Sequence, residues 1–432
     1  MNQILVALAL AAGVAAGSIF DAAWLIVRNT HFDPTFNGVD WNQVHDDLRP
    51  RAEAAPTPDA LRAVITDMLA RLGQSHFALV PAGAGGEAAD LSGSPGFEFR
   101  LVDREAIVVT VDPTGPAAGI VRPGWSMSTI DGAGVGTILD GIPASPASPL
   151  VRFEAWRRVT ARVRGPVGAP VGIVFADETG GLHRASLRRE PEPGQRVQVG
   201  SLPMLAVQTS SRAVPTPSGR TAGVIRFNVW MAPVDGFVQR AVDQFRGAAG
   251  IILDLRGNPG GLAMMVMGIS GHFLNEPVLL GRMKTRDADL RLSANPRRVS
   301  AAGAPVDPYA GPVAILVDDL TGSASECFAG GMQAIGRARV FGTRTMGQAL
   351  PAIFSRLPNG DVLVHAFGDF VTASGVRLEG RGVVPDVEVP IARRPLAEGR
   401  DPALEAALRW IDATGPGGVP RVHVHLRPGR GL

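Results

Sequence analysis

Ser323 is the residue whose type and surroundings best suit nucleophilic chemistry. Residues 317–323 read Val-Asp-Asp-Leu-Thr-Gly-Ser, and they join a buried-type strand predicted over 313–317 to a helical run that begins near the serine. A hydroxyl at such a junction lies close to the helix N-terminus, where free N–H groups and the helix dipole favour a developing negative charge. A serine that only caps the helix fits the same pattern, as Ser325 also does, so the segment alone allows either role.

A glycine-rich turn supplies a second candidate element. Residues 254–261 read Asp-Leu-Arg-Gly-Asn-Pro-Gly-Gly and follow the apolar run 251–253, so a buried strand is predicted to end directly in the turn. The paired Gly260 and Gly261 let main-chain N–H groups approach a reacting atom without obstruction by a side chain. An oxyanion hole requires donors of that kind, although a plain tight turn has the same composition.

Taken together, the two segments resemble the paired signature of the tail-specific, or carboxy-terminal processing, proteases of the tricorn-core superfamily. In that family the first serine of a Ser-Ala-Ser-Glu run is the nucleophile, which implies this role for Ser323. The similarity covers nearly the whole chain. It implies hydrolysis of peptide bonds through an acyl-enzyme, with the oxyanion held by N–H groups of Gly260 or Gly261 and of Ala324.

The residue expected to act as the base for Ser323 differs from the one found in the tail-specific proteases. Those proteases use a lysine in a Gly-Lys-Gly segment beyond the serine, whereas this chain has Gly347-Gln348-Ala349 there. A glutamine amide cannot accept the proton as a neutral amine would. Lys284 precedes the serine, in a stretch (280–310) that is predicted to be surface loop because of its Arg, Pro and Gly residues. The sequence therefore disfavours a serine–lysine dyad.

His76 supplies another base. Residues 69–76 read Leu-Ala-Arg-Leu-Gly-Gln-Ser-His and resemble the segment that carries the catalytic histidine in the tricorn-type branch. That branch has a catalytic Ser-His-Ser-Glu tetrad, and the resemblance implies that its members in this chain are Ser323, His76, Ser75 and Glu379. An imidazole with an ordinary pKa near ~6.5 can take a proton at neutral pH, and a carboxylate fixes its tautomer. A structural histidine at position 76 and a surface-turn glutamate at position 379 are the alternatives.

The predicted helix before His76 would hold it rigidly. Thr57 and Pro58 form a helix start, with a capping residue followed by proline at the first helical position, and Gly73 ends the helix. One apolar face at helical spacing consists of Leu61, Val64, Ile65, Met68, Leu69 and Leu72.

Residues 93–192 have the character of short strands separated by Gly and Pro. The run 115–124, Gly-Pro-Ala-Ala-Gly-Ile-Val-Arg-Pro-Gly, resembles the PDZ signature, and Gly96, Phe97, Glu98 and Phe99 lie where that family has its carboxylate-binding loop. The resemblance implies an inserted PDZ-like domain that binds peptides, and a strand edge of this kind accepts an added peptide strand. A β-rich insertion without a ligand is the alternative.

The remaining chain predicts an α/β core, because strands and helices alternate from about residue 223. The resemblance gives this core the crotonase-like ββα type. The predicted organisation is a signal peptide (1–17), a helical region carrying His76 (18–92), the PDZ-like domain (93–192), the peptidase core (193–395), and a C-terminal helix and tail (396–432).

Composition excludes several other classes. The 432 residues carry a net charge of only +2 with scattered arginines, which argues against nucleic acid as a partner. Cys327 is the single cysteine, so neither an internal disulfide nor a cysteine-based zinc site can form, and we expect no metal or organic cofactor. The apolar run 4–17 resembles an export signal and is too short to span a membrane. The expected protein is therefore periplasmic or secreted and acts on polypeptides, through their C-termini where the PDZ resemblance applies.

Two other functions fit the same scaffold. One is a catalytically silent binding protein, because the superfamily includes retinoid-binding relatives and the lysine is missing. The other is an esterase or small-peptide hydrolase. The joint presence of Ser75, His76, Ser323 and Glu379 favours a peptidase.

Overall fold

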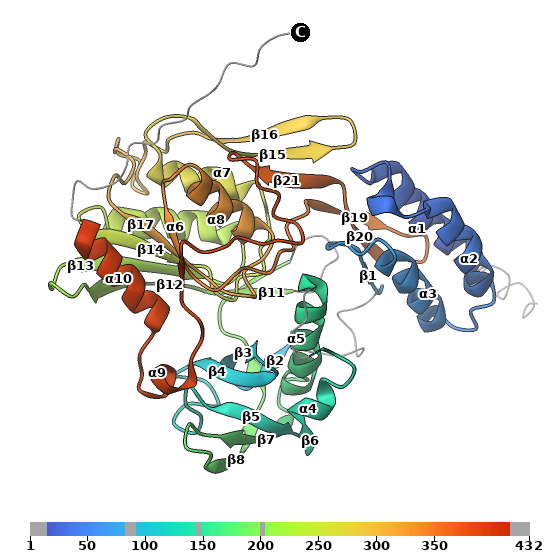
Figure 1. The fold of residues 1–432 in the computed structure, drawn as a ribbon, viewed down its shortest axis with the longest axis horizontal. Coiled ribbons are helices and arrows are strands. Elements are labelled where there is room, and N and C mark those ends of the chain that lie inside the picture. Colours follow the sequence, from blue (N-terminus) through green and yellow to red (C-terminus); the bar gives the residue numbers. More distant parts are fainter. Residues whose placement is uncertain (1–14, 83–91, 144–147, 199–203, 415–432) are drawn as a thin grey trace, which may run out of the picture.

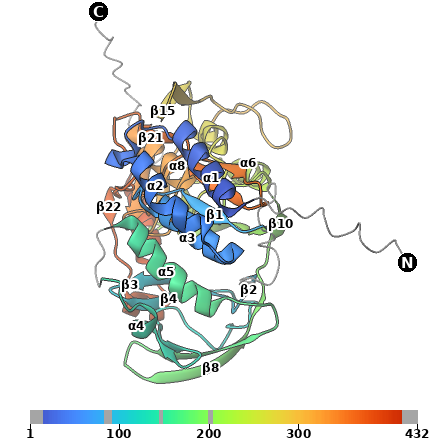
Figure 2. The same ribbon diagram turned by 90° about the vertical axis from the view of Figure 1, so that its right-hand side faces the viewer.

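The computed structural model describes residues 15–82, 92–143, 148–198 and 204–414, which form a mixed α/β fold. An α/β core carries an N-terminal helical region on one side and a β-rich region on another (Figures 1 and 2). All of the predicted site residues lie within the described ranges.

The N-terminal region consists of α1 (Ala16–Thr30), α2 (Trp41–Glu53) and α3 (Pro58–Ala70). Helix α3 begins as predicted, since the Thr57 hydroxyl accepts a hydrogen bond from the Ala60 N–H at 3.2 Å. The predicted apolar face of α3 is buried, and it shares a hydrophobic cluster with Leu357 and Leu363 of the core. The helix that precedes His76 is therefore fixed to the core by apolar contacts.

The core is built on one six-stranded sheet of order β12-β13-β14-β17-β18-β22. Strand β12 is antiparallel to β13, and the remaining neighbours are parallel. The strands are β12 (Thr209–Pro215), β13 (Thr221–Phe227), β14 (Gly250–Asp254), β17 (Val313–Val317), β18 (Arg339–Gly342) and β22 (Val387–Glu388). The predicted strands at 251–255 and 313–317 correspond to β14 and β17, which are buried at every position.

Helices cover both faces of this sheet, which explains why its central strands β14 and β17 are buried at every position. Helices α6 (Pro233–Gln244), α7 (Met265–Ser270) and α8 (Ala324–Ala334) pack on one face together with Leu253 and Ile315. Helix α10 (Pro402–Thr414) packs on the other face against Ile252 and Leu316.

The β-rich region is an antiparallel sheet of order β3-β4-β5-β7-β8 with its own hydrophobic cluster. Helix α5 (Pro149–Val163) packs beside it, with α4 (Val135–Ile138) near one end (Figure 1). The strands are β3 (Phe97–Val102), β4 (Glu105–Val111), β5 (Ser126–Ile130), β7 (Pro170–Ala176) and β8 (Leu182–Arg188), with β6 (Ala133–Gly134) beside β5. Two short pairs, β2 (Gly93–Ser94) with β9 (Glu190–Pro191) and β10 (Gln195–Val197) with β11 (Leu205–Val207), lie where the region joins the core.

A three-stranded sheet ties the N-terminal region to the core. Strand β1 (Ala78–Val80), directly after His76, pairs with β20 (Val362–Ala366), which pairs with β19 (Ala352–Arg356). Because β19 follows Gln348 by only a few residues, this sheet brings the segment around His76 to the segment around Gln348.

The prediction of a surface loop over 280–310 is wrong for its first half. Strands β15 (Val278–Thr285) and β16 (Asp289–Ala294) form a hairpin there, and β15 also pairs with β21 (Gly368–Thr372). Residues 289–294 read Asp-Leu-Arg-Leu-Ser-Ala, and this polar–apolar alternation is typical of a strand. The Arg, Pro and Gly content of the longer stretch outweighed that local signal in the prediction.

Most of the predicted signal peptide and the end of the tail, residues 1–14 and 415–432, lie outside the described residues. Ala16 and Gly17 form the first residues of α1. Within the described ranges no helix is both long enough and apolar enough to cross a membrane.

Candidate active site

Ser323 lies at the junction between β17 and α8, as the sequence predicted. The chain leaves the sheet after Val317, turns through residues 318–322 and enters α8 at Ala324. The backbone angle φ of Ser323 is +51°, a value that residues with a Cβ rarely adopt. The Ser323 N–H donates to the main-chain oxygen of Gln348 at 2.9 Å, and this main-chain hydrogen bond helps to hold Ser323 in its strained conformation.

His76 reaches Ser323 from the N-terminal region. Its Nε2 lies 3.3 Å from Ser323 Oγ, although 247 positions separate the two residues. His76 also has a left-handed conformation, with φ +60°. Two strained residues that meet at one contact are typical of a functional site, where the surrounding structure compensates for the strain.

Hydrogen bonds behind His76 fix its tautomer. Ser75 Oγ donates to Glu379 Oε2 at 2.8 Å, and the Ser75 N–H donates to Glu379 Oε1 at 2.8 Å. Since the only hydroxyl hydrogen of Ser75 is used in this way, its oxygen accepts from His76 Nδ1, which lies 2.7 Å away. Nδ1 therefore carries the proton, and Nε2 presents a free lone pair to the Ser323 hydroxyl.

Burial keeps this imidazole neutral. Removal from water lowers the pKa of His76 to about 4, because the charged form loses its hydration. Burial also raises the pKa of the Glu379 carboxyl, an effect opposed by its hydrogen bonds from Ser75 and from the Ala349 N–H. The imidazole is therefore neutral at neutral pH, as a general base requires, while both oxygens of Glu379 act as hydrogen-bond acceptors.

The pH dependence of catalysis follows from this imidazole. With His76 as the proposed base, the active form is the deprotonated imidazole, so we expect activity at neutral pH and its loss as the pH falls through the pKa of His76. We expect the acidic limb of kcat/KM to lie below the ordinary histidine value of about 6.5. A pH profile on an uncharged peptide measures this, and a limb centred above that value would contradict a desolvated His76.

The glycine turn lies directly against the nucleophile. A Cβ built on Gly260 would stand 2.5 Å from Ser323 Cβ and 2.9 Å from the Ala324 nitrogen, so only glycine allows this approach. Gly260 and Gly261 have φ +107° and +137°. The Gly260 N–H donates to Asn258 Oδ1 at 3.0 Å, and a Cβ on Gly261 would meet Trp230. The structure thus brings Gly260 and Ala324 together beside Ser323, with Gly261 next in the turn.

Glu326 is a structural part of the site to which the sequence analysis gave no role. Its carboxylate is fully buried and accepts from the N–H groups of Ser323 (3.1 Å), Gly347 (2.7 Å) and Gln348 (3.0 Å), and also from the Thr345 hydroxyl. Burial raises its pKa to about 7. A glutamate three residues after a helix-capping serine was the available signal, because that spacing forms a capping box.

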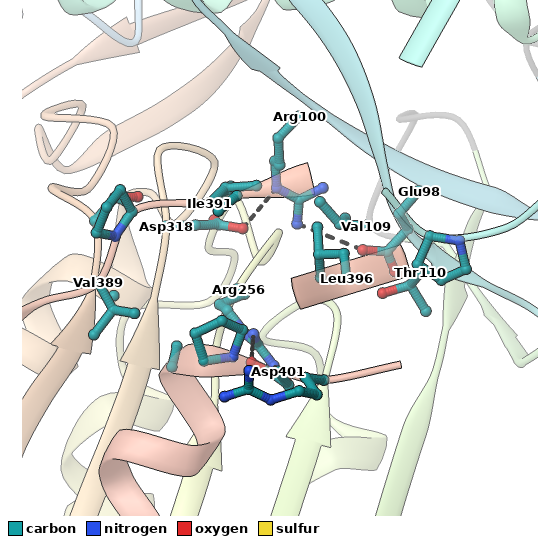
Figure 3. Close-up of a pocket in the computed structure, with 18 of the residues that line it drawn as sticks. Glu98, Arg100, Val109, Thr110, Arg256, Asp318, Val389, Ile391, Leu396 and Asp401 are labelled. Atoms are coloured by element: carbon teal, nitrogen blue, oxygen red, sulfur yellow. Dashed lines mark hydrogen bonds and ion pairs between the residues drawn. The ribbon is translucent and has the colours of Figure 1, made fainter. Parts of the chain in front are cut away.

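A buried ion pair joins the β-rich region to the site, and it too was missed. Arg100 of β3 donates to Asp318 Oδ2 at 2.6 Å, while Asp318 Oδ1 accepts from the N–H groups of Gly257 (2.9 Å) and Leu320 (3.1 Å). Asp318 therefore holds the glycine turn and the nucleophile turn in one register. Figure 3 shows this pair at a pocket of about 210 Å³ between the β-rich region and the core, where Arg256 also pairs with Asp401.

Replacing only one residue of the Arg100–Asp318 ion pair should destabilise the protein, and replacing both residues together should cost less than the sum of the two single losses. We expect Arg100→Met or Asp318→Asn alone to cost about 3–5 kcal/mol, because each leaves a buried group without its partner. The double variant should recover part of that loss. Urea denaturation of the wild type, the two single variants and the double variant measures the coupling energy between Arg100 and Asp318. Additive losses of stability would contradict the coupling.

The predicted peptide-binding residues lie at the edge strand of the β-rich sheet. Gly96, Phe97 and Glu98 line a cavity of about 860 Å³ between this sheet and strands β12 and β13. Glu98 pairs with Arg226 of β13 at 2.8 Å. Phe97 and Phe99 both pack in the hydrophobic cluster of the β-rich region, and Phe99 does not line the cavity.

Within the described ranges, no three His, Cys, Asp or Glu side chains are arranged to hold a metal ion. The groups that meet at Ser323 are those of nucleophilic acyl transfer.

Comparisons with known proteins agree with this chemistry. Peptidase family S41 matches residues 221–389, which hold Ser323 and Glu379, and the tricorn protease C1 domain matches residues 17–70. The C-terminal processing peptidase, chloroplastic, of Tetradesmus obliquus is 27% identical over 391 residues, which cover 86% of this chain and 76% of that protein. Tricorn protease homolog 1 of Streptomyces coelicolor is 27% identical over 406 residues, 90% of this chain but 34% of that protein.

Solved structures share the fold. The photosystem II D1 C-terminal processing protease superposes with a TM-score of 0.59 over 95% of this chain and 100% of its own, at 22% sequence identity. Mature CPAF complexed with lactacystin gives a TM-score of 0.59 at 13% identity. The chain therefore contains a peptidase family S41 domain preceded by a tricorn-type C1 domain, and it is a serine-type peptidase.

Proposed function

We propose that this peptidase cleaves polypeptides near their carboxyl ends and uses His76 as the base for Ser323. The observation that carries the proposal is the continuous series Glu379–Ser75–His76–Ser323, whose contacts measure 2.8, 2.7 and 3.3 Å. The family resemblance assigns Gln348 to the position of the lysine base, and an amide cannot fill that role.

The reaction proceeds in two halves. Ser323 Oγ attacks the carbonyl carbon of the scissile bond while its proton moves to His76 Nε2. The N–H groups of Ala324 and Gly261 stabilise the oxyanion, because the Gly260 N–H donates to Asn258. The C–N bond then breaks, and Nε2 returns the proton to the leaving amine. Water attacks the acyl-enzyme in the same way and releases the carboxylate product. Ser75 and Glu379 keep Nδ1 protonated throughout, and no cofactor is required.

The architecture suits this use. In the proposal, the core is of the crotonase-like ββα type and the β-rich region is a PDZ-like domain. The cavity beside Gly96, Phe97 and Glu98 would receive the end of a polypeptide, with the main chain of residues 96–99 as its donors. Preference for a carboxyl end is also supported by the names of the relatives, which are C-terminal processing peptidases.

Cleavage and labelling assays test the proposal. We expect the protein to degrade denatured casein and to react with a fluorophosphonate at Ser323, while Ser323→Ala does neither. Two peptides that differ only in a free or an amidated carboxyl end test the preference, and the free acid should be cleaved faster.

Each other result identifies an alternative. Absence of both cleavage and labelling would indicate a binding protein. Hydrolysis of activated esters without cleavage of polypeptides would indicate an esterase. Equal rates on the two peptides would remove the carboxyl-end preference and leave an endopeptidase.

The proposal includes export to the periplasm or the medium. It is motivated by the apolar run at 4–17. Fractionation of cells that express the chain tests it, and recovery of the protein only with the cytoplasmic fraction would overturn it.

A further inference from the structure

Trp230 joins the two segments that carry the proposed oxyanion donors. Its side chain is fully buried beside Phe227 and Phe328, whose ring centroids lie 5.0 and 5.3 Å away. The indole Nε1–H donates to Ser325 Oγ at 2.7 Å. Ser325, which is also fully buried, directly follows Ala324 at the start of α8. The catalytic steps use neither Trp230 nor Ser325 directly.

The main chain of Trp230 holds the glycine turn on both sides of Gly261. The Trp230 N–H donates to the Gly260 oxygen at 2.8 Å, and the Leu262 N–H donates to the Trp230 oxygen at 2.8 Å. These two bonds form a parallel bridge between Trp230 and Gly261. A Cβ on Gly261 would collide with the Trp230 oxygen, so only glycine fits at this contact. Trp230 therefore sets the direction in which the Gly261 N–H points.

The N–H groups of Gly261 and Ala324 are the donors left for an oxyanion. Within the described ranges neither of them donates a hydrogen bond, whereas the Gly260 N–H donates to Asn258 Oδ1. The Ala324 N–H stands at the first position of α8, where a helix supplies no partner of its own. The other donor belongs to the turn that follows β14. Since two separate segments must point their donors at one oxygen, the spacing between the segments decides how well both can bind it.

We infer that Trp230 is a positioning residue that sets the spacing of the two oxyanion donors. This inference rests on the proposed function. The main chain of Trp230 fixes the donor of Gly261, and its indole holds α8 through Ser325, one residue beyond the donor of Ala324. Without the indole hydrogen bond, the turn and the helix can shift relative to each other, and small misplacements of such groups slow a reaction strongly.

Two variants remove this hydrogen bond from opposite ends. Trp230→Phe keeps an aromatic ring without the N–H, and Ser325→Ala removes the acceptor. We expect each to lower kcat for peptide cleavage about tenfold, which is part of the loss of about 10²–10³-fold that follows removal of a whole donor. KM should stay within about twofold, because the oxyanion forms only after the substrate is bound. The double variant should lose no more kcat than either single variant, since both remove the same bond.

The carbonyl stretch of the acyl-enzyme distinguishes donor spacing from a general loss of stability. Hydrogen bonds to a carbonyl oxygen lower its stretching frequency, so donors that have moved apart give a higher frequency. Infrared difference spectra of Ser323 acylated by unlabelled and by carbonyl-carbon-13 4-nitrophenyl cinnamate measure it. We expect a higher frequency in Trp230→Phe and in Ser325→Ala than in the wild type. The acidic limb of kcat/KM, which reports His76, should not move.

Trp24→Phe is the matched control. The Trp24 indole on α1 is also buried, and its Nε1–H donates to the main-chain oxygen of Trp41 at 2.8 Å. This variant should melt at a lower temperature than the wild type and keep both its kcat and its carbonyl frequency.

The inference is overturned if Ser325→Ala keeps the wild-type kcat or shows an unshifted carbonyl frequency. It is also overturned if Trp24→Phe loses as much kcat as Trp230→Phe, because stability alone would then explain the loss. Should Trp230→Phe not fold, Ser325→Ala decides the question. A wild type that neither cleaves peptides nor takes up the cinnamoyl group would show instead that the proposed function has failed.

Discussion

Replacing His76 by alanine is expected to lower kcat for peptide cleavage by about 10⁴–10⁶-fold. The loss is large because the Ser323 hydroxyl has a pKa far above neutrality. It can lose its proton only to a base, and His76 Nε2 lies 3.3 Å away. Gln348 cannot replace the imidazole as acceptor of that proton. Steady-state kinetics measures the effect, and fluorophosphonate labelling at Ser323 should slow in parallel.

A matched control is His183→Ala. His183 lies on β8 of the β-rich region and pairs with Asp177 at 2.8 Å, away from Ser323. It should change activity by no more than about twofold. A His76→Ala protein that retains most of the wild-type kcat would show that another group takes the proton.

Gly260→Ala is expected to lower kcat by about 10²–10³-fold, the loss associated with one oxyanion donor. The added methyl would stand 2.5 Å from Ser323 Cβ, so the turn has to move away from the nucleophile and its N–H groups move with it. The left-handed φ of +107° adds backbone strain to this steric conflict.

Gly303→Ala separates the two effects. Gly303 also has a left-handed φ, +81°, but a Cβ there meets nothing within 4 Å. It should lose about 1 kcal/mol of stability through strain and keep its kcat. The steric account would be refuted by a Gly260→Ala enzyme with unchanged kcat and a stability loss like that of Gly303→Ala.

Local signals in the sequence were sufficient for many elements. Thr57 and Pro58 start α3 through a side-chain cap and a preset φ, and the apolar run at 313–317 is β17. The hairpin β15–β16 was missed because the Arg, Pro and Gly content of 280–310 was given more weight than the alternation of polar and apolar residues over 289–294.

The residues of the site could be predicted from the sequence only where a local pattern or the family resemblance marks them. Ser323 and its turn have a local pattern, but Ser75 and Glu379 are 304 positions apart, and only the resemblance to tricorn-type peptidases connected them. Nothing comparable connects Arg100 with Asp318, because ion pairs between distant segments depend on how the β-rich region docks. Glu326 was recognisable as a helix cap, but its bonds to Gly347 and Gln348 arise from tertiary packing.

The central claim is that His76 presents an unprotonated Nε2 to Ser323, and nitrogen-15 NMR of histidine-labelled protein tests it most directly. With the His76 signals assigned by comparison with His76→Ala, we predict the Nδ1–H tautomer between about pH 5 and 8. An imidazolium in that range, or a neutral ring with its proton on Nε2, would contradict the account.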